Sequence, residues 1–169
     1  MMRTHRTMAT TLAAVALAGA AGAGVAQAAP ATAGSAAPSA CRPANHIAKV
    51  AQVPGNTGHL HYRVTLTAPR GYESCELAGS PTDVRFSHHG SQVAATTDAY
   101  GDQKTVVTFG PGHPVHYDIL VRGSSRATPA DEVSFTLQAP DGEIPGTSFA
   151  EGSLKVADGT LIGPIAPGA

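Results

Sequence analysis

Closely spaced histidines are the residues of this chain best suited to bind a metal ion. His59 and His61 are separated by one residue in the stretch HLHYRVTLT. On a β-strand two such imidazoles leave the same face, about 7 Å apart, and neighbouring strands could complete a zinc or copper site. Arg63 is the next side chain on that face, and its positive charge opposes a bound cation. We therefore expect two solvated histidines, with zinc or copper binding as the alternative.

Two other groups of histidines are less suited to share an ion. Adjacent residues of a strand point to opposite faces, so His88 and His89 could bind one metal only with a turn between them. We expect a polar strand end that enters a turn at His89-Gly90. His113 is expected in a loop and His116 on the polar face of a strand. No cofactor is therefore expected.

The residue pattern does not favour an enzyme. The chain has no G-x-S-x-G nucleophile motif. Gly123-Ser124-Ser125 reads as a loop between strands. Acidic residues are not paired by a spacing that suits acid–base catalysis; they include Asp83, Asp118, Asp131 and Glu132. We expect no catalytic residues and no enzymatic activity.

The loop Ala68-Pro69-Arg70-Gly71-Tyr72 is a candidate for contact with a partner. Arg and Tyr are over-represented among residues that dominate binding energy. Pro69 stiffens the loop, and Cys75 follows it closely. We expect Arg70 and Tyr72 to form the partner surface, if this loop is more than an ordinary surface turn.

The elements that position these side chains are predicted to be β-strands. Apolar residues alternate with polar ones, which is typical of half-buried strands, in stretches around residues 60–66, 84–88, 115–121 and 133–137. Shorter candidates span 47–53, 92–96, 105–109 and 154–156. Seven to nine short strands with turns between them predict an all-β antiparallel sandwich of immunoglobulin-like architecture. A type I turn is expected at Ala139–Gly142 and a hairpin loop at Asp158-Gly159.

The first residues have the three parts of a secretory signal peptide. Arg3 and Arg6 form a positive region, an apolar stretch follows, and Ala26-Gln27-Ala28 is a cleavage motif. Cleavage is expected between Ala28 and Ala29. Residues 29–40 are rich in Ala and Pro and predict a flexible leader, and residues 41–165 predict one folded domain. Because the segment is mostly Ala and Gly, it suits a cleaved signal better than a membrane anchor.

Charge argues against nucleic acid as the main partner. Cleavage removes two of the eleven Lys and Arg residues and leaves all twelve Asp and Glu, so the formal charge falls from −1 to −3. A basic run is also absent from the sequence. We expect a secreted monomer with no membrane span after cleavage.

The chain contains two cysteines, Cys41 and Cys75. An even number of cysteines in an exported protein usually indicates pairing. The bridge would close a loop of about 35 residues and stabilise the fold by roughly 3–4 kcal/mol in the chain-entropy model. Two free thiols are the alternative.

Four segments together resemble a known family. They are CRPANHIAKV from Cys41, YRVTLTAP from Tyr62, CELAGSPTDVRF from Cys75 and FGPGHPVHYDILV from Phe109. Over roughly Cys41 to Leu137, their order and spacing resemble the secreted actinobacterial domain of unknown function 4232. The resemblance implies an exported β-sandwich with Cys41 paired to Cys75, and it implies no catalytic or binding residues. This chain differs in having Ala68 where the family often has Asn, and in lacking further cysteines in its C-terminal half.

These observations predict a secreted, non-enzymatic β-sandwich. Its partner is expected to be an extracellular protein or a ligand of the cell envelope. An extracellular zinc- or copper-binding protein that uses His59 and His61 is one alternative. A secreted protease inhibitor that presents the loop around Arg70 and Tyr72 is another.

Overall fold

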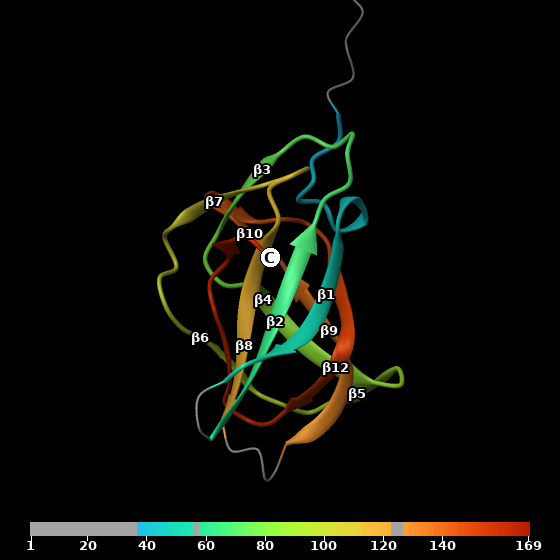
Figure 1. The fold of residues 1–169 in the computed structure, drawn as a ribbon, viewed down its shortest axis with the longest axis vertical. Helices are drawn as coiled ribbons and strands as arrows, with labels where there is room; N and C mark the ends of the chain where they lie inside the picture. Colours follow the sequence, from blue (N-terminus) through green and yellow to red (C-terminus); the bar gives the residue numbers. More distant parts are fainter. Residues whose placement is uncertain (1–36, 56–57, 123–126) are drawn as a thin grey trace, which may run out of the picture. The chain divides into compact units, whose positions relative to one another are not determined.

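The computed structural model describes residues 37–55, 58–122 and 127–169 of the chain, and these residues fold into β-strands (Figure 1). The described part contains no α-helix, and its one helical turn is the short 3-10 helix η1 (Pro43–Asn45). The all-β prediction is therefore confirmed. The predicted cleavage site at Ala28 and Ala29 lies outside the described residues, as does Gly123-Ser124-Ser125.

The strands that build the body of the fold overlap the segments predicted from the sequence, although the strands predicted at 133–137 and 154–156 begin earlier, at Thr128 and Ser148. They are β1 (Ile47–Val53), β2 (His59–Thr67), β4 (Thr82–His88), β7 (Val106–Phe109), β8 (Val115–Arg122), β9 (Thr128–Thr136) and β12 (Ser148–Val156). Shorter strands complete the fold: β3 (Cys75–Ala78), β5 (Ser91–Val93), β6 (Thr97–Ala99), β10 (Gln138–Ala139), β11 (Gly142–Glu143), β13 (Thr160–Ile162) and β14 (Ala166–Pro167).

Most strands lie in one curled sheet, in the order β5-β4-β9-β12-β1-β2-β8-β13-β6, with β14 also paired to β8. Two of its pairings are parallel, β1 with β12 and β13 with β6, and the other pairings are antiparallel. The expected antiparallel sandwich is thus confirmed only as an all-β fold. The structure is mainly a single mixed sheet that resembles half of a barrel.

The core lies on the inner side of this curl. Alternate residues of β8 (Val115, Tyr117, Ile119 and Val121) are fully buried, as the period of two predicts. The small sheet of β3 and β7 contributes Leu77 and Phe109 to the same buried cluster. This pair of strands therefore helps to cover the core.

Two of the three predicted turns lie where they were expected. His89-Gly90 connects β4 to β5, because His88 pairs with Ser91. Pro140-Asp141 connects β10 to β11. The hairpin predicted at Asp158-Gly159 was wrong. A turn exists there, but β13 pairs with β8 and β6 and not with β12.

Gly152 allows β12 to run close beside β1. The register between β12 and β9 shifts between Glu151 and Leu154, which marks a β-bulge around Gly152. Gly152 has a φ of +153°, and a Cβ at this position would lie 2.9 Å from the Cβ of Val50 and against its carbonyl oxygen. No larger residue fits without displacing β1.

Replacement of Gly152 by alanine should destabilise the protein strongly. Backbone strain and overpacking against β1 each cost about 1–3 kcal/mol, so we expect the free energy of unfolding to fall by about 2–6 kcal/mol. Urea unfolding followed by circular dichroism measures this change. Gly159→Ala is the matched control, because Gly159 also has a positive φ (+73°) but no atom lies within 4 Å of the added Cβ. Equal losses in the two variants would contradict the proposed contact with β1.

Candidate functional site

A disulfide bond joins Cys41 to Cys75, with a Cα–Cα distance of 6.0 Å. The predicted pairing is therefore confirmed. The bridge fastens the segment before β1 to the start of β3. Backbone hydrogen bonds strengthen the same connection: the N–H of Ala40 donates to the carbonyl of Glu73 at 2.8 Å, and the N–H of Glu73 donates to the carbonyl of Pro38 at 3.1 Å.

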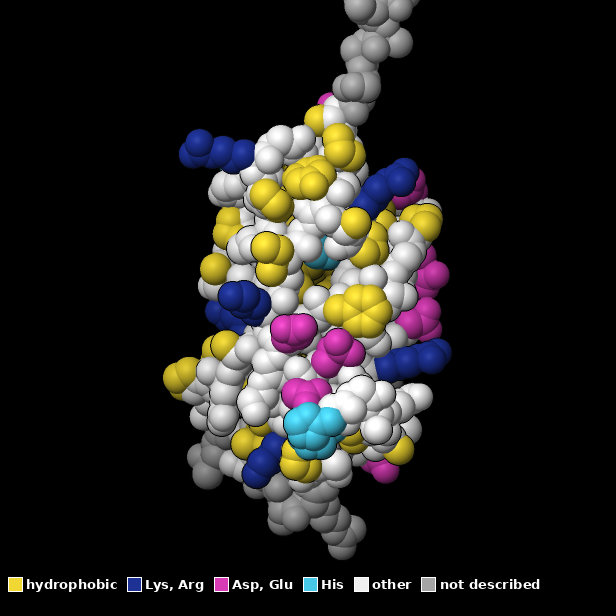
Figure 2. All heavy atoms as spheres, turned by 90° about the vertical axis from the view of Figure 1, so that its right-hand side faces the viewer, with side chains coloured by type: hydrophobic (Ala, Val, Ile, Leu, Met, Phe, Trp, Pro, Cys, Tyr) yellow, Lys and Arg dark blue, Asp and Glu magenta, His cyan; other side chains and the backbone are white. Residues whose placement is uncertain are grey.

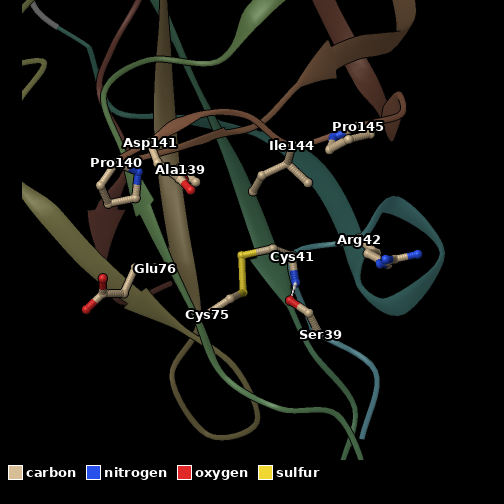
Figure 3. A pocket seen from close by; sticks show the side chains of 10 residues that line it. All are labelled: Ser39, Cys41, Arg42, Cys75, Glu76, Ala139, Pro140, Asp141, Ile144 and Pro145. Carbon is tan, nitrogen blue, oxygen red and sulfur yellow. Dashed lines mark hydrogen bonds between the residues drawn. A yellow bond between two sulfur atoms is a disulfide. The ribbon is translucent and has the colours of Figure 1, made fainter. Parts of the chain in front are cut away.

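A cleft of about 620 Å³ lies beside this disulfide (Figure 3). One wall is the segment that carries Ser39, Cys41 and Arg42, and another is the start of β3 with Cys75 and Glu76. The late part of the chain supplies the remaining wall, with Ala139, Pro140, Asp141, Ile144 and Pro145 from the β10–β11 hairpin and the residues that follow it. We call this the disulfide cleft.

The centre of the disulfide cleft is apolar and its charges lie at the edges. In Figure 3, Ile144 and the disulfide face each other across the middle, whereas Glu76 and Arg42 lie at opposite ends. Arg42, Glu76 and Asp141 are exposed. Volumes of about 300–1,000 Å³ with apolar walls and a few polar groups are typical of ligand sites.

The polar groups of the cleft are the hydroxyl of Ser39 and the charged side chains of Arg42, Glu76 and Asp141. The hydroxyl oxygen of Ser39 accepts a hydrogen bond from the N–H of Cys41 at 3.2 Å. No histidine is among the residues that line the cleft, so none of them can take a proton from Ser39 as an imidazole base would. The charged side chains of the cleft can attract a ligand that has an apolar middle and polar groups on both sides of it.

His46 supports the wall of the cleft that carries Ser39 and Cys41, because it bonds to Ala40 between them. Its Nδ1–H donates to the carbonyl oxygen of Ala40 at 2.9 Å, because a carbonyl can only accept, and Nε2 accepts from the hydroxyl of Ser148 at 3.0 Å. The ring also packs edge-on against Phe109, with centroids 5.7 Å apart. Burial lowers the pKa of His46 below its ordinary value of 6.5, although hydrogen bonds to the backbone of Ala40 and Arg42 partly oppose the shift. Sequence reasoning did not single out this residue, since a lone histidine before a strand carries no motif.

The structure separates the two histidines that the sequence offered as metal ligands. His59 is exposed, whereas the Nε2 of His61 lies 3.1 Å from Oδ2 of Asp118 on β8. Arg63 donates from Nε to the other oxygen of Asp118 at 3.0 Å. The expected solvated pair was thus wrong for His61, because the neighbouring strand supplies a carboxylate that the sequence of β2 could not show. Among the described residues, no set of three metal-ligating groups includes His59 or His61.

Asp118 is the centre of this small charged network. Burial would raise the pKa of its carboxyl group, but the hydrogen bonds and charges of Arg63 and His61 outweigh burial and lower it below 3.8. The carboxylate is therefore kept ionised and engaged by the guanidinium of Arg63. This arrangement joins β2 to β8 on the outer face of the sheet and leaves Asp118 poorly placed to serve as a metal ligand.

The loop proposed for partner contact lies at the same end of the fold as the disulfide, but it does not line the cleft. Arg70 is exposed, and Tyr72 is half-buried and packs against the core. Much of the Tyr72 ring is therefore used for internal packing. Whether Arg70 and Tyr72 contact a partner stays a prediction.

The two adjacent histidines are closer together than strand geometry alone predicts. The Nδ1 atoms of His88 and His89 lie 3.3 Å and 3.2 Å from the same oxygen of Asp131. The turn expected at His89-Gly90 is the reason, because His89 has a φ of +49° there and no longer follows strand alternation. The backbone changes direction there and brings the second imidazole to the side of the first.

Comparisons with known proteins do not assign the chain to a family. No protein-family model matches the chain, and no curated protein or solved structure is significantly similar to it. The resemblance to the domain of unknown function 4232 therefore stays a prediction. Among residues 37–55, 58–122 and 127–169, no helix has the length and apolar character needed to cross a membrane.

The lowered pKa of His46 predicts a loss of stability in mild acid. Below pH 6.5 the imidazole takes up a proton more readily in the unfolded chain than in the native one, so the free energy of unfolding falls as the pH falls through the native pKa. Above pH 6.5 the imidazole is neutral in both states, and its contribution to the free energy of unfolding is fully present. Urea unfolding at several pH values between 6.5 and 3.8, the ordinary pKa of aspartate, measures the effect.

His46→Gln is the matched variant for this test. Glutamine keeps a polar side chain near Ala40 and Ser148 but cannot titrate. We expect a flatter dependence of stability on pH in this variant. The same slope in both proteins would show that His46 is not the group responsible.

Proposed function

We propose that this chain is an exported, non-enzymatic β-domain that binds an extended peptide segment of an extracellular or cell-envelope protein in the disulfide cleft. The observation that carries the proposal is the cleft itself, an apolar cavity of about 620 Å³ with charged residues only at its edges. Such a cavity suits an apolar side chain presented by a partner.

The chemistry of the edges favours a peptide over a purely apolar molecule. Glu76 and Asp141 are acidic, and Arg42 lies at the end opposite Glu76. An extended peptide carries hydrogen-bonding groups on both sides of each side chain, so it can meet both ends while an apolar residue occupies the middle. The disulfide and the hydrogen bonds between Ala40 and Glu73 pre-organise two of the walls, which reduces the entropy lost on binding.

Arg70 and Tyr72 could extend this contact surface, since their loop leads directly into the strand that carries Cys75. A role for this loop as a protease inhibitor has no separate observation in its favour, and metal binding by His59 and His61 is opposed by the contacts of Asp118. The absence of a basic run and the formal charge of −1 over the whole chain support a protein partner over nucleic acid.

Export is supported by two independent features. The first is the succession of basic residues, apolar stretch and Ala26-Gln27-Ala28 at the N-terminus. The second is the disulfide, since such bonds form and persist in oxidising compartments. The resemblance to a secreted family agrees with both features. We propose that the chain belongs to that family because of the four segments that carry the resemblance.

Mass spectrometry of the protein from culture medium tests the export proposal. We expect an intact mass that corresponds to a chain beginning at Ala29, and a non-reduced digest in which the Cys41 and Cys75 peptides are linked. Replacement of Ala26 and Ala28 by bulky residues should block processing, because signal cleavage needs small side chains at those positions. Retention of the complete N-terminus in the medium would contradict cleavage.

Selection of peptides from a random displayed library tests the cleft. We expect enriched peptides to bind the oxidised protein and to lose about tenfold or more in affinity to Ile144→Lys, because one buried aliphatic side chain is worth about 1.5–3 kcal/mol. Circular dichroism verifies that the variant is folded.

Phe149→Lys is the control for this selection. Phe149 is a large apolar residue, 57% exposed, that does not line the cleft. It should leave peptide binding unchanged. Peptides that bind Ile144→Lys as tightly as the parent, or that depend on Phe149 instead, would place the binding surface elsewhere.

A further inference from the structure

The tip of the β4–β5 hairpin gathers three metal-ligating side chains that the proposed peptide site does not use. His88 ends β4, His89 lies in the two-residue turn, and Asp131 projects from the neighbouring strand β9. Figure 2 faces the side of the molecule on which the hairpin projects, and it shows exposed histidine side chains next to acidic ones. Of the residues that the structure describes, these three form the one group whose ligand atoms all lie within 4.8 Å of one another.

Strand pairing and turn geometry bring the three side chains together. Ser87 pairs with Glu132 between β4 and β9, so the next residues along the two strands are His88 and Asp131. The turn that follows holds His89 at a φ of +49° and Gly90 at +77°. The N–H of His89 donates to both oxygens of Asp131, at 3.2 Å and 3.0 Å, and this holds the carboxylate against the turn.

Two of the three distances between donor atoms match those around a bound ion. Ligand atoms about 2.0–2.1 Å from a tetrahedral ion lie roughly 3.3 Å from one another. The Nδ1 atoms of His88 and His89 lie 3.3 Å and 3.2 Å from Oδ2 of Asp131. The two rings are close, with centroids 4.1 Å apart. All three donor atoms lie within 4.8 Å of one another, so rotation of the side chains is the movement needed to bring them around one ion.

A cation would also satisfy a nitrogen that the protein leaves without a partner. Nδ1 of His88 is buried and makes no hydrogen bond within the described structure, although it lies 3.3 Å from Oδ2 of Asp131, and Nε2 of His61 is in the same condition beside Asp118. Only a lone pair on Nδ1 can bind a metal ion, so the tautomer of His88 that carries its N–H on Nε2 is the one suited to share a cation with Asp131.

We propose that His88, His89 and Asp131 form a surface site for a divalent transition-metal ion, with Cu²⁺ bound more tightly than Zn²⁺. Two imidazole nitrogens and one carboxylate oxygen suit these two ions. Ca²⁺ and Mg²⁺ prefer sets made only of oxygen atoms. Since His89 is largely exposed, water or a group from a partner completes the coordination. This site is separate from the disulfide cleft and does not depend on the proposed peptide binding.

Calorimetric titration with Cu²⁺ and Zn²⁺ tests the proposal, on oxidised protein without a histidine tag and after removal of metal by a chelator. We expect one ion per chain and tighter binding of Cu²⁺. His89→Asn should weaken binding by at least about tenfold, because even indirect changes at metal sites cost 10–100-fold in affinity. Asparagine tolerates the positive φ of the turn, so the loss should not come from misfolding. Asp131→Asn should weaken binding as well.

Two further experiments distinguish this site from other histidines. The double variant His59→Asn/His61→Asn and the single variant His113→Asn remove imidazoles outside the cluster and should leave the affinity unchanged. Paramagnetic Cu²⁺ should selectively broaden the NMR signals of the imidazoles of His88 and His89. No binding by the parent protein, or binding that His89→Asn leaves intact, would overturn the proposal. Loss of binding in the His59/His61 variant would overturn it too.

Discussion

The parallel pairing of β1 with β12 makes one sheet out of two groups of strands. On one side of it lie β5, β4, β9 and β12, and on the other lie β1, β2, β8, β13 and β6. The direct register between the two groups comprises Ala48 with Ala150 and Lys49 with Glu151. Gly152 ends this register, because its missing side chain lets the backbone of β12 bend against Val50. The curl of the sheet, and hence the enclosure of the core, depends on this short contact.

This contact explains why the sequence predicts a sandwich and the structure has a curled sheet. Within each group, nearly every pairing is antiparallel, as hairpins and alternating apolar residues suggest. Alternation identifies strands such as β2 and β8, in which buried and partly buried residues follow each other regularly. It carries no information about which strand edges meet. Short strands such as β13 and β14 are also missed, because two or three residues cannot display a period.

For the candidate sites too, the sequence predicts local features but does not predict contacts between segments that are far apart in the chain. The two cysteines can be paired from their number and the export signal alone. The cleft beside them cannot be predicted, because its walls include Ser39–Arg42 and Ala139–Pro145, which are far apart in the sequence. Asp118 and Asp131 likewise approach their histidines from neighbouring strands. The direction in which the His89 side chain points depends on one backbone angle in a turn, and strand periodicity does not describe turns.

The position of β1 in the sheet has a consequence for the order in which the molecule folds. A chain made from its N-terminus produces β1 and β2 first, and these can pair as a hairpin at once. The second edge of β1 must wait until Ala150 has been made, since its partner lies near the end of the chain. Pairings between distant segments form slowly because a large loop must close first. During this interval the apolar face of the early strands is exposed, so the growing chain is most vulnerable to aggregation just before its last strands arrive.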